Sequence, residues 1–365
     1  MPQIDRFFDA LLNEGASDLH LSPGYPPMMR QKGNLVPMPG FSPLSAESIE
    51  PILYEILNPT ERETFDQERD LDFAYAFGAK ARFRGNYLAK TTGVGAVFRT
   101  IPTEILTLEQ LALPPAVRTL ADKKVGLILV TGPTGSGKST TLAAILDYVN
   151  KTRSGHILTI EDPVEFVHQP QRCQITHREV GRDVPSFYHA IRSAGREDAD
   201  VVLVGELRGA ETMGLALQMA SSGVLVFATI HTNSAAATID RFVNAFPPSE
   251  QSAVRAMLAE TLTGVVSQQL LPRADGKGRV AAQEILICSP AVASTIREAK
   301  TAMIASLIQS GRAVGMQTMD SVLEKYIQDQ LVDPLDAFEK SSDKESFKRL
   351  PQVARALAAT ESSTV

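Results

Sequence analysis

The sequence has no tryptophan and only two cysteines, Cys173 and Cys288, which lie far apart and form no C-x-x-C pattern. Two isolated cysteines exclude a four-cysteine zinc site within the chain, and their scarcity is typical of a reducing compartment. No apolar run approaches the roughly 18 residues that a membrane-spanning helix needs. The segment from Met1 to Arg6 lacks a basic region followed by an apolar stretch. We therefore expect no secretory signal and a cytoplasmic location.

The chain also has no excess of basic residues. Its 36 Lys and Arg against 42 Asp and Glu give a formal net charge of −6 and a pI near 5.6. A surface that neutralises nucleic-acid phosphates must be basic, so we expect no nucleic acid as principal partner. This balance disfavours a DNA-translocating or helicase-like ring, although a local basic stripe can exist within an acidic total. With 365 residues and 44% hydrophobic content, the chain is long enough for two domains.

Residues 1–100 are expected to form a small α+β domain. Apolar side chains at helical spacing predict an amphipathic helix over 5–13. Ser45 and Asn58 are N-cap candidates for two further helices, 45–57 and 59–67. Alternating apolar and polar residues predict antiparallel strands. The strand candidates of this domain are 18–21, 28–36, 71–75, 81–88 and 95–99.

A proline-bearing linker is expected over 101–117, and the pattern changes beyond it. Strands and helices alternate from about Val125, which predicts a parallel sheet in an α/β core over 118–288. A hairpin is expected from 266 to 287, followed by a helical region over 289–365 whose last ~25 residues are increasingly solvated. The parallel strand candidates are 127–130, 156–160, 201–204 and 225–230.

A phosphate-binding pattern stands at the start of this core. Residues 132–139 read GPTGSGKS, which fits G-x-x-x-x-G-K-[ST], between an apolar run and a helix-forming segment. Glycines in such a loop let backbone N–H groups turn toward phosphate oxygens, and the helix N-terminus adds its positive end. We expect Lys138 to reach the β- and γ-phosphates of a nucleotide and Ser139 to bind Mg²⁺. The expected nucleotide ligands are Gly132, Pro133, Thr134, Gly135, Ser136, Gly137, Lys138, Ser139 and Thr140.

Polar side chains follow each of the other parallel strand candidates. Ligands of parallel sheets bind beyond the carboxyl ends of the strands, so these side chains are expected to face the nucleotide. Glu206, which follows 201–204, is the candidate for the acid that holds the Mg²⁺ shell. Glu161 and Asp162 are candidates to orient the ion or its waters. The alternative for Glu206 is an ordinary surface carboxylate at a strand end, and the alternative for Glu161 and Asp162 is a capping and turn cluster.

Two further residues have both a catalytic and a structural interpretation. Glu165 lies on a loop beyond Pro163, from which it could reach the attacking water as general base. The alternative is a turn and capping cluster. His231 ends the strand 225–230 and is a candidate to contact the γ-phosphate, but a histidine at this place is as often structural.

Arg82, Arg84 and Arg99 lie on strands of the first domain, distant in sequence from the phosphate loop. By themselves they indicate a solvated strand face. If that domain docks over the nucleotide site of a neighbouring subunit, their planar guanidinium groups could stabilise phosphoryl charge.

Several of these motifs occur in an order that is typical of one family. They comprise the segments 17–21, 81–84, 96–102, 132–140, 159–168, 201–208, 228–233 and 315–318. The sequence resembles the retraction ATPases of type IV pili, PilT-type motors of the secretion-ATPase superfamily, over essentially its whole length. The resemblance implies an N-terminal PAS-like domain, a RecA-like P-loop core and a homohexameric ring that hydrolyses ATP with Mg²⁺.

The resemblance also implies roles and partners. Glu165 would be the general base, Glu206 the Walker-B acid and His231 the second residue of the His box, while Arg84 and Arg99 would act in trans on the γ-phosphate. Hydrolysis would pull pilin subunits out of the fibre and power twitching motility. The motor would be peripheral at the inner membrane through a platform protein of the pilus machinery, with a paralogous retraction ATPase as a further partner.

Three positions depart from the family pattern. Val224 stands where an earlier histidine of the His box is usual, Gly195 where a leucine is usual, and Gly209 where an aspartate often follows Arg208. The phosphate loop and the main acids are intact, so we expect hydrolysis to survive. Some segments resemble the accessory PilU-type paralogue more, which leaves main and accessory motor open. An assembly or type II secretion ATPase is a further alternative, but such proteins usually carry a tetracysteine zinc insertion.

Overall fold

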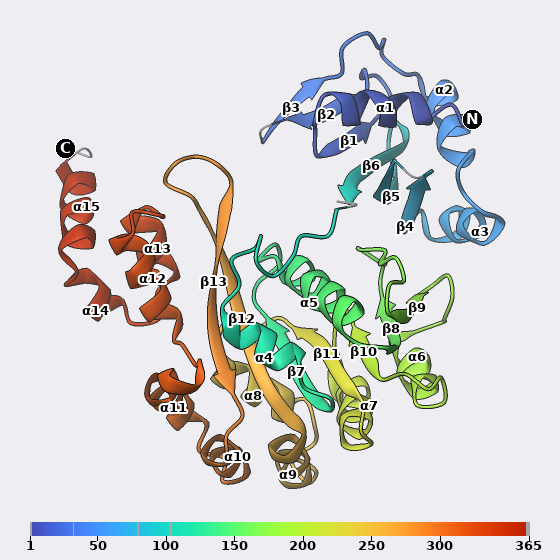
Figure 1. Ribbon diagram of the computed structural model, residues 1–365. Helices are drawn as coiled ribbons and strands as arrows, with labels where there is room; N and C mark the ends of the chain where they lie inside the picture. Colours follow the sequence, from blue (N-terminus) through green and yellow to red (C-terminus); the bar gives the residue numbers. More distant parts are fainter. Residues whose placement is uncertain (1, 32, 79, 102–103, 363–365) are drawn as a thin grey trace. The chain divides into compact units, whose positions relative to one another are not determined.

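The computed structural model describes residues 2–31, 33–78, 80–101 and 104–362 (Figure 1). The chain forms two compact units. The first comprises Met1–Glu104 together with Pro163–Val167, and the second comprises Ile105–Asp162 with His168–Val365.

The N-terminal unit is built on a six-stranded antiparallel sheet with the strand order β3-β2-β1-β6-β5-β4. Its strands are β1 (Asp18–Leu21), β2 (Met28–Gln31), β3 (Asn34–Pro37), β4 (Asp70–Phe77), β5 (Ala81–Lys90) and β6 (Gly93–Ile101). Its helices are α1 (Asp5–Asn13), α2 (Ala46–Tyr54) and α3 (Pro59–Glu68). All of these elements were predicted, and the side chains of Ser45 and Asn58 accept the expected N-cap hydrogen bonds.

An aromatic core holds this unit together. Phe8 of α1 is buried and stacks on Phe83 of β5, with ring centroids 4.1 Å apart, and meets Phe98 of β6 edge-on. Gly85 leaves room for these rings, because a Cβ built there would lie 2.8 Å from the ring of Phe73. Burial alternates along β5, so that its other face carries the polar side chains.

The second unit is built on a seven-stranded sheet with the order β13-β12-β7-β11-β10-β8-β9. All its strands are parallel except β13, which pairs antiparallel with β12. The strands are β7 (Gly126–Thr131), β8 (Gly155–Glu161), β9 (Cys173–Glu179), β10 (Val201–Val204), β11 (Leu225–Ile230), β12 (Leu262–Pro272) and β13 (Arg279–Ile287). The mixed α/β class with a parallel sheet and a terminal hairpin is confirmed.

Helices cover both faces of this sheet. Leu127 and Leu129 of β7 pack into one buried cluster with α6 to α9, whereas Ile128 and Val130 pack into another with α4 and α5. The helices are α4 (Pro115–Ala121), α5 (Lys138–Thr152), α6 (Phe187–Ala194), α7 (Gly209–Ser221), α8 (Ala235–Asn244) and α9 (Gln251–Thr261). Hydrophobic cores on both faces explain why the central strands read as continuous apolar runs.

The C-terminal part of the second unit is helical (Figure 1), and its described residues form six α-helices and two short 3-10 helices after β13. The α-helices are α10 (Pro290–Arg297), α11 (Ile304–Ser310), α12 (Met319–Gln328), α13 (Pro334–Lys340), α14 (Lys344–Lys348) and α15 (Pro351–Ser362). Leu271 of β12 and Leu323 of α12 share a core with Phe347 and Val353, both fully buried. The sequence predicted a solvated segment here, but these two apolar side chains anchor α14 and α15.

Three more observations concern the predictions for the chain as a whole. The strand β9 was not predicted, because its polar sequence CQITHRE is only partly buried at an edge of the sheet. Within the predicted linker 101–117, residues 102 and 103 lie outside the described residues, Ile101 ends β6, and Val117 of α4 is buried. Among the described helices, none combines the length and the apolar character that a bilayer crossing requires.

Candidate active site

The phosphate-binding pattern forms a loop between β7 and α5, as predicted. Gly132, Gly135 and Gly137 all have positive φ, at 146°, 77° and 85°. Gly137 is the N-cap of α5, so the backbone N–H groups that begin this helix point into the loop. A Cβ at position 132 would lie only 2.2 Å from the carbonyl oxygen of Gln268 on β12. The loop is therefore seated tightly against the neighbouring strand, which requires glycine at this position.

Lys138 places its ammonium group inside this loop. The side chain is buried, and Nζ donates hydrogen bonds to the carbonyl oxygens of Gly132 and Pro133, each at 3.0 Å. Nζ also lies 3.5 Å from Nδ1 of His231. The hydroxyl of Ser136 is buried and has no hydrogen-bond partner among the residues that the structure describes. A buried cation, an orphaned hydroxyl and inward-facing amides together fit a bound phosphate group.

The strand order explains why distant residues meet beside the loop. The parallel strands β7, β11, β10 and β8 are neighbours in that order. The phosphate loop, His231 and Glu206 follow the carboxyl ends of the first three, and Glu161 is the last residue of β8. Gly205 donates its N–H to the carbonyl of Ile160 at 2.8 Å. A Cβ at position 205 would lie 3.3 Å from Cα of Glu161. The structure thus brings together Lys138, His231, Glu206 and Glu161, with Asp162 next in the chain.

Glu206 lies at the centre of the charged groups of this edge. Its carboxylate contacts Arg208 Nη2 at 2.7 Å and His231 Nε2 at 3.4 Å. Partial burial alone would raise the pKa of Glu206. The hydrogen bond and the charge of Arg208, together with His231 and Lys138, outweigh burial and hold this pKa below its ordinary value. Glu206 is therefore an ionised acid, available as a ligand for a divalent cation.

A row of hydroxyl groups, buried except for the partly buried Thr232, supports the turn that carries His231. Thr232 and Thr238 exchange a hydrogen bond of 2.7 Å, Thr238 reaches Thr131 at 3.4 Å, and Thr131 bonds Ser267 at 2.7 Å. Thr131 directly precedes the phosphate loop. The hydroxyl row therefore links the His231 turn, the phosphate loop and β12, and Thr131, Thr238 and Ser267 within it are shielded from water.

No ready-made metal cage occurs in the described part of the chain, where no three His, Cys, Asp or Glu side chains are grouped to hold an ion. Mg²⁺ typically takes one or two carboxylates and completes its shell with phosphate oxygens and water. Ser139 at the start of α5 and the carboxylates of Glu206, Glu161 and Asp162 fit that mode. The residues present therefore suit a magnesium ion that arrives with a nucleotide.

The remaining predicted residues lie in the other unit. Glu165 belongs to the segment Pro163–Val167, which groups with the N-terminal unit. Arg99 and Arg84 are direct cross-strand neighbours on β6 and β5. Arg99 contacts the buried Asp18 at 2.8 Å, and Arg84 lies 3.5 Å from Asp72. Both side chains are exposed, Arg84 to 46% and Arg99 to 73%, on the face of the sheet opposite its aromatic core.

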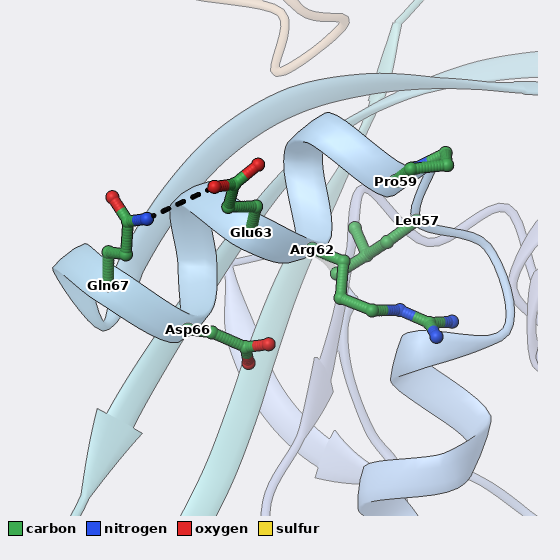
Figure 2. A pocket seen from close by; sticks show the side chains of 6 residues that line it. All are labelled: Leu57, Pro59, Arg62, Glu63, Asp66 and Gln67. Carbon is green, nitrogen blue, oxygen red and sulfur yellow. Dashed lines mark hydrogen bonds between the residues drawn. The ribbon is translucent and has the colours of Figure 1, made fainter.

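Two cavities belong to this description. One adjoins the candidate site and is lined by Glu206, Arg208, His231 and Arg241 among others. The other lies on the surface of α3 in the N-terminal unit (Figure 2), where Gln67 donates to Glu63 at 3.3 Å. All its lining residues come from one helix and the turn before it, and they offer no convergent chemistry.

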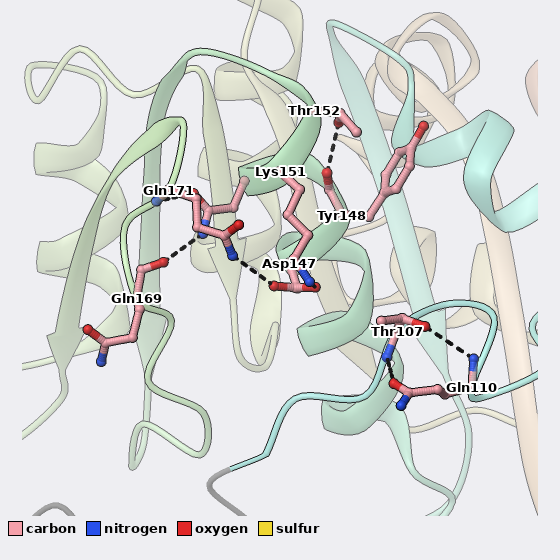
Figure 3. A network of polar contacts seen from close by, with 9 residues as sticks. Thr107, Gln110, Asp147, Tyr148, Lys151, Thr152, Gln169 and Gln171 are labelled. Carbon is pink, nitrogen blue, oxygen red and sulfur yellow. Dashed lines mark hydrogen bonds and ion pairs between the residues drawn. The ribbon is translucent and has the colours of Figure 1, made fainter.

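The far end of α5 anchors the chain between β8 and β9 (Figure 3). Asp147 pairs with Lys151 at 2.6 Å, and the side chain of Gln171 donates to Asp147 at 3.5 Å. Asn150 donates to the carbonyl of Gln169 at 2.8 Å. The same helix that begins at the phosphate loop therefore also holds the segment that follows the acids at 161 and 162.

Comparison with known proteins places the chain in a family. The family described as "Type II/IV secretion system protein" matches residues 2–354. The type IV pilus retraction ATPase PilT of Pseudomonas aeruginosa is 49% identical over 334 residues, 92% of this chain and 96% of that protein. This chain belongs to the type II/IV secretion system protein family. Its place within the family is among the pilus retraction ATPases.

Two further relatives agree with this assignment. The type IV pilus ATPase PilU of Pseudomonas aeruginosa is 38% identical over 90% of this chain and 86% of that protein. A crystal structure of the pilus retraction motor PilT with bound ADP has a TM-score of 0.89 at 41% identity. It covers 95% of this chain and 99% of that one. The similarity therefore extends over both units.

Of the three departures from the family pattern, Val224 and Gly195 lie away from the acids of the site, whereas Gly209 is exposed beside them and lines the same cavity as Glu206 and Arg208. Val224 precedes β11 and packs on a hydrophobic core at the amino end of the strand, whereas His231 follows its carboxyl end. Gly195 ends α6, and no atom lies within 4 Å of a Cβ built there. Gly209 begins α7 with a φ of 79°. A valine at 224 therefore adds to the core and removes nothing from the phosphate loop.

Two residues of the site were not predicted. Gln268 is buried on β12 against the phosphate loop, and Arg208 forms the ion pair with Glu206. Arg208 belongs to the motif segment 201–208, and its position two residues after Glu206 could have indicated an ion pair between them. Gln268 gave no signal, because its role depends on which strand lies beside β7.

Proposed function

We propose that this chain is the ATPase subunit of a homohexameric motor that powers type IV pilus retraction and thereby twitching motility. The supporting observation is the meeting of Lys138, Glu206 and His231 at the carboxyl edge of adjacent parallel strands. This arrangement occurs in a chain that is 49% identical to a pilus retraction ATPase. Binding and hydrolysis of ATP would drive movements that extract pilin subunits from the fibre.

The chemistry assigned to the second unit is charge neutralisation and positioning. The phosphate-loop amides and Lys138 bind the β- and γ-phosphates, and the Ser136 hydroxyl gains an acceptor there. Mg²⁺, when bound, neutralises developing phosphate charge. Ser139 and Glu206 would hold it, and Glu161 and Asp162 would contact the ion or its waters. His231, held by the hydroxyl row, contacts the γ-phosphate.

The remaining roles are assigned to the N-terminal unit and its associated segment. Glu165 is the general base that takes a proton from the attacking water. Arg84 and Arg99 stabilise the γ-phosphate charge of a neighbouring subunit in trans. Their position supports this role, because both are exposed and Asp18 and Asp72 orient them from the same face.

The architecture that goes with this function has four parts. Residues 1–100 form a PAS-like domain, 101–117 a linker, 118–288 a RecA-like core, and 289–365 a helical region. The motor is cytoplasmic and reaches the inner membrane through a platform protein of the pilus machinery. A paralogous retraction ATPase is a further partner.

The main retraction motor is favoured over an accessory motor of the PilU type, since identity to PilT is 49% and identity to PilU is 38%. Deletion of the gene in its host tests the proposal. Excess surface pili with lost twitching is the expected result. Failure of retraction only under high load would assign the accessory role, and loss of all pili would contradict retraction in favour of assembly.

A further inference from the structure

We propose that Gln268 is a positioning residue for the phosphate loop. We also propose that Gln268, Gln283 and Gln317 form an amide relay that couples nucleotide binding to the C-terminal helices. The proposal rests on the proposed function only in that the loop binds a nucleotide. It gives a role to Gln268, a buried residue of β12, and to the segment 315–318. Neither takes part in the catalytic roles described above.

Gln268 holds the phosphate loop through both its backbone and its side chain. Its carbonyl oxygen lies so close to Gly132 that a Cβ built at that position would be only 2.2 Å from it. Its side-chain Nε2 donates to the carbonyl of Ser136 at 2.6 Å, and Oε1 accepts from the hydroxyl of Thr141 at 2.8 Å. One amide therefore ties the middle of the loop to the first turn of α5. Gln268 is only 2% exposed, so water does not compete for these bonds.

The relay continues across the β12–β13 hairpin. Gln283 stands directly opposite Gln268 in the antiparallel register, is equally buried, and donates from Nε2 to Oε1 of Gln268 at 3.2 Å. The backbone carbonyl of Gln283 accepts a bond of 2.7 Å from the side chain of Gln317. Gln317 also exchanges two backbone hydrogen bonds with Ile285, at 2.9 and 3.2 Å. It thus extends the sheet by an isolated bridge just before Thr318 caps α12.

The contrast with the next residue shows that this arrangement is specific. Gln269 has the same side chain on the same strand but lies on the opposite face, where its amide donates to the carbonyl of Lys340 at 3.4 Å. A buried amide that loses its partner carries the full desolvation cost, whereas a partly exposed one is rescued by water. A displacement of Gln317 therefore shifts the backbone of Gln283, and with it the side chain that bonds Gln268 beside the loop. Loss of the hydrogen bond of Gln269 does not affect the loop.

The consequence is a two-way coupling between the site and the C-terminal helices. Nucleotide binding draws the loop around the phosphates and thereby stabilises the packing of α12 against the sheet. Conversely, a change in the packing of α12 against the sheet alters the affinity for nucleotide. This link gives the C-terminal region a route to the site that does not pass through the N-terminal unit.

The test compares Gln268→Met with Gln269→Met in the full-length protein. The measurements are ADP affinity by fluorescent-nucleotide displacement, KM and kcat for ATP, and thermal melting. We expect Gln268→Met to raise the ADP Kd and the ATP KM about 10-fold, as for loss of a buried hydrogen bond. We expect a smaller change in kcat and no change for Gln269→Met. If Gln268→Met lowers the melting temperature but leaves the ADP Kd and the ATP KM unchanged, Gln268 has only a structural role and the proposal is overturned.

Two further variants guard against misfolding and test the coupling. Thr141→Val removes one hydroxyl that bonds Gln268 and is expected to raise the ADP Kd about 3-fold in a folded protein. Gln317→Leu should weaken ADP binding, and its effect should be less than additive with that of Gln268→Met. Strict additivity or unchanged binding in Gln317→Leu would refute the relay. If the wild-type protein binds no nucleotide, the proposed function fails. If the wild type binds and all variants match it, only this inference fails.

Discussion

Replacing Gly132 with alanine should destabilise the second unit more than the same change at Gly135, although both residues belong to the phosphate loop. At Gly132 the backbone φ of 146° is a region that L-residues rarely adopt, and the new methyl group would lie 2.2 Å from a backbone oxygen of β12. Backbone strain of this kind costs about 1–3 kcal/mol. Forcing a methyl into a packed site costs about 1–3 kcal/mol more.

At Gly135 only the conformational part applies. Its φ is 77°, and nothing lies within 4 Å of an added Cβ. A left-handed backbone at a non-glycine residue costs about 1–2 kcal/mol. Denaturant-induced unfolding should therefore show a loss of about 2–6 kcal/mol for Gly132→Ala and about 1–2 kcal/mol for Gly135→Ala.

The comparison also tests whether the loop is seated on β12. If Gly132→Ala unfolds at the same denaturant concentration as Gly135→Ala, the close approach of the loop to Gln268 is wrong. A smaller loss in Gly132→Ala would contradict the account in the same way.

The other predictions concern catalysis and pH. Lys138→Ala should abolish ATP turnover with the fold retained, and unchanged turnover would remove the assigned site. Glu165→Gln should keep nucleotide affinity while kcat falls by at least about 100-fold, the usual contribution of a general base; a rate within a few-fold of wild type would exclude it as the base. Mixing Arg84→Ala subunits with Lys138→Ala subunits should restore part of the activity, whereas no rescue at any ratio counts against the shared site. Burial, reinforced by His177, lowers the pKa of His168 to about 4 from its ordinary 6.5, so the unfolded chain takes up a proton first. Stability should fall as pH drops from about 6.5 to 4, by up to about 3 kcal/mol, and His168→Asn should remove that part of the loss in unfolding titrations.

Much of the fold could be predicted because local patterns determine it. The helix over 5–13 has the same bounds in the structure, and the central strands were visible as apolar runs because helices cover both of their faces. The strand β9 could not be found in this way. It is a polar edge strand, and its place depends on backbone pairing with β8 rather than on an apolar pattern.

The candidate site was predictable where the chemistry follows a strand end. Glu206, His231 and Glu161 meet beside the phosphate loop because parallel strands end at one edge of the sheet. The ion pair of Arg208 with Glu206 and the seat that Gln268 forms for the loop were not predictable. Both depend on side-chain directions and on strand neighbours that are distant in sequence.

The most direct test of the central claim is a structure of the protein with Mg²⁺ and a non-hydrolysable ATP analogue. The account predicts that Lys138 leaves the carbonyls of Gly132 and Pro133 for the β- and γ-phosphates. Glu206 should then face the magnesium ion or its water shell instead of Arg208. A nucleotide bound elsewhere, or one bound in the loop while the carboxylates of Glu206 and Glu161 point away from the ion, would contradict it.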